Sequence, residues 1–179
     1  MRNVERGIRL GILGAFVHGI RRRNPAIIVN AVLSYGASFL PGVVERMVGI
    51  QFRPWQRIYV EIAMLTHAVG MCGPYDEVWW WDHLTHTHSA TLLGGLVHVI
   101  ARRRNQAPTP RVLAAVMVVS LGWEVLEFLI HVVARRLGFE PILVVYGPRD
   151  TLLDLVFDLV GALLVLLFGD WFLANFVKN

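Results

Sequence analysis

The chain has 179 residues, of which 55% are hydrophobic and 17% are charged, and its mean hydropathy is +0.53. A soluble domain carries about a quarter charged residues, so this composition leaves no room for a soluble catalytic domain and predicts an integral membrane protein. The formal net charge is +4. Because the arginines lie at the ends of apolar segments, where they meet lipid headgroups, nucleic-acid binding is not expected.

Apolar segments alternate with short connections rich in Gly, Pro and Arg, and a span needs about 20 mostly apolar residues. The first segment, residues 7–20, is short and flanked by Arg6, so it is either a span or an interfacial amphipathic helix. The later segments are expected at residues 26–48, 58–72, 82–101, 111–135 and 150–177. The sequence therefore predicts an all-α, polytopic transmembrane helical bundle with about six membrane segments, or five if the first is interfacial. We expect a single membrane domain over residues 1–179.

Lysine and cysteine each occur once in the chain, which restricts the kinds of cofactor that it could hold. Lys178 is the only lysine and the penultimate residue, whereas a retinal Schiff base in mid-membrane needs a lysine inside a helix. Retinal is therefore excluded. Cys72 is the only cysteine, which excludes an intrachain disulfide and a cysteine-rich zinc or iron–sulfur site.

Ionisable residues recur at helical spacing inside the last three segments. Each costs about 2.5–3.5 kcal/mol inside a span, so each is a functional hypothesis. Asp82 and His86 are four residues apart and share one face of a helix. Each of the next two segments also has ionisable residues spaced three or four apart, which places them on one helix face. These residues are Glu124, Glu127 and His131 in the segment at 111–135, and Asp150, Asp154 and Asp158 in the segment at 150–177.

The positions of these three groups of residues along their segments predict that they lie at the same depth in the bilayer and meet there. Two of them lie at the start of their segments and one lies near the end, so alternating spans bring all three to the same side. Carboxylates with imidazole form a donor set suited to zinc, manganese or iron. The candidate metal ligands are Asp82, His86, Glu124, Glu127 and Asp154. The candidate catalytic bases, or supports of the ligands, are His131 and Asp158.

The arginines predict an orientation. The connection between Arg102 and Arg111 carries four arginines and is expected in the cytoplasm. The polar site then faces the extracytoplasmic side of a cell (plasma or inner) membrane that the chain crosses several times. Arg135, Arg136 and Arg149 would lie at its mouth, where they could bind an anionic lipid headgroup, although their outward placement opposes the arginine bias.

Several of these residues have a structural alternative. Asp150 could be the N-cap of the last helix. His83 and His88 are expected to point away from the face of Asp82 and His86, as interfacial or helix-packing residues. Glu61 and His98 are expected to serve in packing or in hydrogen bonds between helices. The whole acidic and histidine set could also be a structural network without a metal.

Three motifs carry a resemblance to a known family. They are Tyr75 followed by Trp81-Asp82-His83-Leu84-Thr85-His86, then Trp123-Glu124-Val125-Leu126-Glu127-Phe128, and Asp150-Thr151-Leu152-Leu153-Asp154-Leu155 followed by Gly161-Ala162. In these residues the chain resembles an uncharacterised family of small multi-spanning membrane proteins with YjdF-like bacterial members, and it is similar to the haloarchaeal type. The resemblance covers about the last two-thirds of the chain and implies a helical membrane bundle without an established activity. It also implies a departure at Asp158, where the family more often has Asn.

Three functional classes remain open. The first is a metal-binding membrane protein, with hydrolysis of a lipid or a lipid-linked phosphate as its reaction. The second is a transporter or channel for a small solute, coupled to protons or cations, in which the same carboxylates form a relay. The third is a non-catalytic subunit of a membrane assembly. The bilayer is the expected partner, and a homo-oligomer is compatible with each class.

Overall fold

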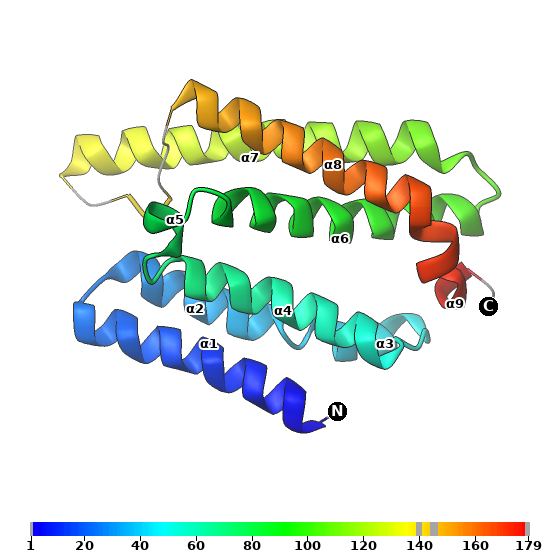
Figure 1. Ribbon diagram of the computed structural model, residues 1–179, viewed down its shortest axis with the longest axis horizontal. Helices are drawn as coiled ribbons and strands as arrows, with labels where there is room; N and C mark the ends of the chain where they lie inside the picture. The colour runs from blue at the N-terminus through cyan, green and yellow to red at the C-terminus, as the bar shows by residue number, and fades with distance from the viewer. Residues whose placement is uncertain (1, 139–140, 144–146, 178–179) are drawn as a thin grey trace. The chain divides into compact units, whose positions relative to one another are not determined.

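The computed structural model describes residues 2–138, 141–143 and 147–177 (Figure 1). All regular structure in these ranges is helical, which confirms the predicted all-α bundle. The helices are α1 (Arg2–Arg22), α2 (Pro25–Ala37), α3 (Leu40–Val48), α4 (Pro54–Gly70), α5 (Pro74–Glu77), α6 (Trp81–Arg103), α7 (Pro108–Leu137), α8 (Pro148–Phe172) and α9 (Ala174–Val177).

Proline and glycine set the ends of these helices. Pro54, Pro108 and Pro148 each occupy the first residue of a helix, where the missing N–H has no partner to lose. Gly138 ends α7 with a φ of 74°, a left-handed conformation that favours glycine. Pro41 lies in the first turn of α3, and its ring cannot continue the preceding helix, so the segment expected at residues 26–48 divides into α2 and α3.

Three helical stretches among the described residues are long and apolar enough to cross a membrane. They are Pro25–Val48, Pro108–Leu137 and Pro148–Phe172, of 24, 30 and 25 residues. The helices α1, α4 and α6 fill the other places where membrane segments were expected. The apolar side chains of Val118, Val125 and Phe128 on α7 are exposed, which is the pattern of a helix that faces lipid.

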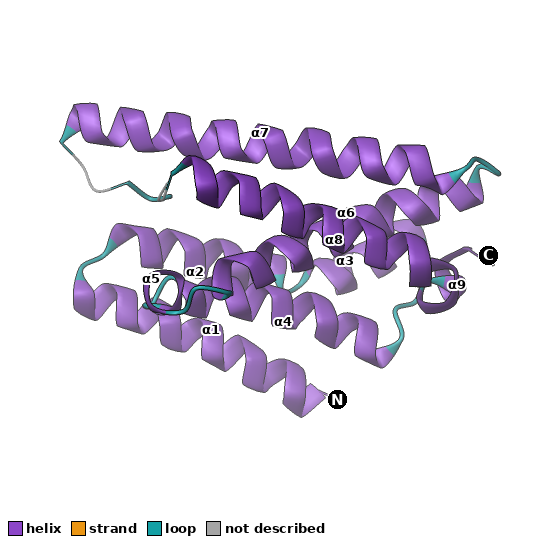
Figure 2. Cartoon of the chain, turned by 45° about the horizontal axis from the view of Figure 1, so that its top comes forward, coloured by secondary structure: helices purple, strands orange, loops and turns teal. Residues whose placement is uncertain are grey.

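The chain forms two compact units, Met1–Trp81 (unit 1) and Asp82–Asn179 (unit 2). In unit 1, α1, α2 and α4 pack side by side around the buried residues Ile8, Ile12 and Ala31 (Figure 1). In unit 2, α7 and α8 pack along one another, as Figure 2 shows. Whether the chain is one domain, as the sequence suggests, stays a prediction.

Small residues let the helices of unit 2 approach closely. A Cβ atom built on Gly94 of α6 would lie 3.3 Å from Val112 of α7 and 3.5 Å from Val165 of α8. One built on Gly161 of α8 would lie 2.7 Å from the Cβ of Ala90 on α6. Gly94 and Gly161 therefore mark the close contacts, which is typical of helix packing in membranes.

Candidate metal site

The helices α6 and α8 run parallel, and this pairing creates the site. The side-chain contacts of His83 with Asp154, His86 with Asp158 and His98 with Asp170 all join residues 71 or 72 positions apart. A nearly constant offset means that both helices advance in the same direction, as expected when one antiparallel helix separates them in the chain. The acids near the start of α8 consequently lie beside the histidines near the start of α6.

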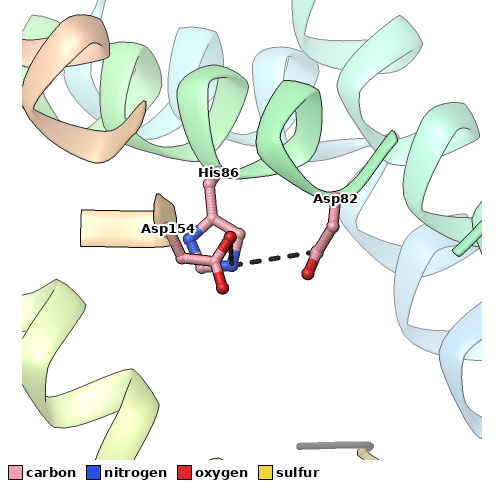
Figure 3. A group of neighbouring side chains, drawn as sticks. All are labelled: Asp82, His86 and Asp154. Carbon is pink, nitrogen blue, oxygen red and sulfur yellow. Dashed lines mark ion pairs between the residues drawn. The ribbon is translucent and has the colours of Figure 1, made fainter. Parts of the chain in front are cut away.

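His86 lies between two carboxylates (Figure 3). Its Nε2 atom is 3.9 Å from Oδ1 of Asp82 and 3.9 Å from Oδ1 of Asp154. One ligand atom from each of these three residues lies within 4.8 Å of the other two. The predicted meeting of Asp82, His86 and Asp154 is therefore found in the structure.

The other nitrogen of His86 is held by Asp158. The Nδ1 atom of His86 is 3.2 Å from Oδ2 of Asp158. In a neutral imidazole whose Nδ1–H donates to Asp158, the lone pair is on Nε2, the atom that faces the carboxylates of Asp82 and Asp154. A carboxylate that orients a histidine in this way is a recurrent support of metal ligands.

His83 is a site residue that the sequence analysis placed wrongly. It is buried, its Nδ1 atom is 3.1 Å from Oδ1 of Asp154, and its ring stacks on Phe157 at 4.6 Å between ring centroids. The expectation that His83 points away considered only the spacing of four that joins Asp82 and His86. The spacing of three between His83 and His86 also places two side chains on one helix face, and this signal was present in the sequence.

Glu124 and Glu127 of α7 also lie near this cluster. Glu124 accepts a hydrogen bond from the Thr151 side chain of α8, and its charge interacts with those of Asp82 and His86. Oε1 of Glu124 is buried and has no hydrogen-bond partner among the described residues. Glu127 interacts electrostatically with Glu124, Asp82 and His86. These two acids are close enough to contribute charge, but the compact ligand group does not include them.

The remaining predicted residues take other positions. His131 is half-buried, and its Nδ1 atom has no hydrogen-bond partner in the described part of the chain. Its proposed catalytic role stays a prediction. Asp150 is not an N-cap, because Gly147 takes that position and Asp150 follows in the first turn of α8. A carboxylate there is favourable because it faces the positive end of the helix dipole.

The three ligand atoms, all within 4.8 Å of one another, would have to move inward to bind one divalent metal ion. A tetrahedral ion bound at about 2.1 Å would place its ligand atoms about 3.4 Å apart, compared with the 3.9 Å separations from His86. Two carboxylates and one imidazole suit zinc, manganese or iron and leave at least one position for water or substrate. The Asp82 side chain is 24% exposed and that of Asp154 is 3% exposed, so the open side lies next to Asp82.

A family model with the description "Predicted membrane protein (DUF2238)" matches residues 5–175. The chain belongs to this family. The DUF2238 match begins near the start of the chain, so the similarity is wider than the last two-thirds that the three motifs indicated. It makes this chain a membrane protein, and its place is the lipid bilayer. Neither the curated proteins nor the solved structures contain a significant match.

Proposed function

We propose that the chain binds a divalent metal ion through Asp82, His86 and Asp154. The observation that carries this proposal is the orientation of His86, whose Nε2 atom is directed at two carboxylates while Asp158 holds Nδ1. A purely structural hydrogen bond needs only one of the two ring nitrogens. Nε2 lies 3.9 Å from an oxygen of either carboxylate, which is too far for a hydrogen bond.

We further propose that the metal supports hydrolysis of a lipid phosphate or a lipid-linked phosphate. The exposed side chains of Arg135, Arg136 and Arg149 lie at the end of α7 and the start of α8, the end of unit 2 that carries the cluster. Guanidinium groups bind phosphate through paired hydrogen bonds. A metal with an open position polarises a phosphoryl oxygen and activates water, and the unpartnered Oε1 atom of Glu124 is available to accept the proton of that water.

Metal analysis of the purified protein tests the first proposal. The wild-type protein is expected to retain about one equivalent of zinc, manganese or iron, measured by mass spectrometry of the elements. Asp82→Ala and Asp154→Asn should lose most of it. The matched control is Asp170→Asn, which changes a carboxylate of the same helix that pairs with His98 and Arg102 instead. A folded wild-type protein without metal would contradict the proposal.

Turnover tests the finer proposal separately. Metal-loaded protein in vesicles that contain phosphatidate or a polyprenyl diphosphate should release phosphate, and Glu124→Gln should slow this release while it keeps the metal. If the protein binds metal but releases no phosphate, the proposed hydrolysis is wrong and the proposed metal site is unaffected. A flux of protons or cations through proteoliposomes that Glu124→Gln abolishes would instead favour the transporter.

A further inference from the structure

A network of charged side chains, most of them partly buried, lies in unit 1 and contains none of the residues of the metal site. Its members come from α1, α3 and α4, and they alternate in sign. They are Glu45, Arg57, Glu5, Arg9 and Glu61, in the order in which they contact one another. Arg57 contacts Glu45 at 2.5 Å and Glu5 at 3.0 Å. Arg9 contacts Glu5 at 4.0 Å and Glu61 at 2.7 Å.

The network leads from the surface of the unit into its interior. The side chain of Glu45, at one end, is 25% exposed, whereas that of Glu61, at the other end, is 0% exposed. Glu61 is the eighth residue of α4, about 10 Å along the helix from its first residue. A carboxylate buried this deeply in a helical membrane bundle requires full compensation of its charge.

The charges of the network do not cancel. Three carboxylates and two guanidinium groups carry a formal charge of −1 when all are ionised, and arginine does not lose its proton in proteins. Each oxygen of Glu5 has an arginine partner. Those of Glu45 contact Arg57 and the backbone N–H of Phe52. Oε2 of Glu61 is the exception, because it is buried and has no hydrogen-bond partner among the described residues.

We infer that Glu61 is a proton-binding site, at which Oε2 takes up one proton and makes the network neutral. The groups that face Glu61 are consistent with this assignment. From α1, Arg9 attracts its negative charge and Glu5 repels it, and Arg57 acts from α4 itself. The helix α2, which packs against α1 and α4, contributes Tyr35 as its only titratable side chain and carries no charge. The helix α2 therefore supplies no cation to balance the third carboxylate.

Infrared difference spectroscopy of the full chain in lipid vesicles tests this inference. The wild-type protein at neutral pH should show the carbonyl band of a protonated carboxylic acid, shifted in heavy water and lost at alkaline pH. The difference spectrum between the wild type and Glu61→Gln should contain this band. The matched control is Glu77→Gln, which changes an exposed carboxylate of α5 in the same unit and should keep the band. A neutral-pH band of the same size in Glu61→Gln would overturn the assignment.

A second variant keeps the test decisive if Glu61→Gln does not fold. Glu45→Gln removes one negative charge at the far end of the network and leaves Glu61 in place. The network is then neutral without a proton, so the band should disappear at neutral pH. A band that survives in Glu45→Gln would contradict the inference. Asp82→Ala, which removes a ligand of the metal site in unit 2, should leave the band unchanged, so the two proposals fail separately.

Discussion

The two ring nitrogens of His86 have different partners, and this arrangement distinguishes the candidate metal site from a simple hydrogen-bonded pair. Nδ1 binds Asp158, and Nε2 faces Asp82 and Asp154. The sequence predicts that Asp158 is a catalytic base or a support of the ligands. Its contact with His86 favours the second role, in which Asp158 fixes the ring orientation and the tautomer of the ligand.

Asp158→Asn tests this role. The amide keeps the size of the side chain but loses the charge that holds Nδ1–H, so metal affinity should fall by about 10- to 100-fold. Competition with a chelator of known affinity measures this change. Asp170→Asn on the same helix should leave the affinity within experimental error. An equal loss in both variants would mean that the effect comes from the stability of α8 and not from His86.

At the scale of the elements, the contact between α6 and α8 decides which side chains meet. Gly161 is central to it, because a Cβ atom there would lie 2.7 Å from the Cβ of Ala90 and 2.7 Å from the backbone oxygen of Thr87. The Thr87 hydroxyl also donates to the backbone oxygen of Phe157 at 3.2 Å. The helices are held close less than one turn from Asp158.

Gly161→Ala should therefore separate the two helices and destabilise the protein by about 1–3 kcal/mol. The movement should also weaken metal binding, because the carboxylates of α8 shift away from α6. The control is Gly122→Ala on α7, where nothing lies within 4 Å of the added Cβ and alanine is the better helix former. Unfolding in detergent measures both variants. Equal stability of the two would show that the α6–α8 contact can relax without cost.

A second histidine pair ties the far ends of the same two helices. Nε2 of the buried His98 lies 2.9 Å from Oδ1 of Asp170, and Arg102 binds the same carboxylate. This confirms the expectation that His98 forms a hydrogen bond between helices. The expectation for Glu61 is confirmed by its hydrogen bond from Arg9. Polar pairs of this kind align helices that have no hydrophobic driving force between them in lipid.

At the scale of the whole molecule, the arginine distribution predicts the orientation in the membrane. Gln106 lies in the exposed connection between α6 and α7, two residues after Arg104, and Ile142 lies in the connection between α7 and α8. In a Cys72→Ser background, Gln106→Cys should react with a membrane-impermeant maleimide only after the cell is opened. Ile142→Cys should react in intact cells, because the arginine distribution predicts that this connection lies outside the cytoplasm. The opposite pattern would place the site in the cytoplasm.

Much of the architecture followed from the sequence alone. The length of the apolar stretches requires helices in lipid, because only they satisfy the backbone hydrogen bonds of a short segment. Proline and glycine mark the helix ends, as at Pro108 and Gly138. Alternation of spans also predicted that Asp82, His86 and Asp154 would meet, since up-and-down helices return to the same side of the bilayer.

Only the tertiary structure decided which faces of those helices meet and at what offset. Spacing along one helix defines its own polar face but carries no information about the neighbour to which that face turns. The spacing of three places His83 on the face of His86, but only the tertiary structure shows that Asp154 is its partner. The pairing of Asp158 with His86, in place of an open catalytic position, has the same cause. The contact of Glu61 with Arg9 has the same cause, because it joins residues of two helices that are 52 positions apart in the chain.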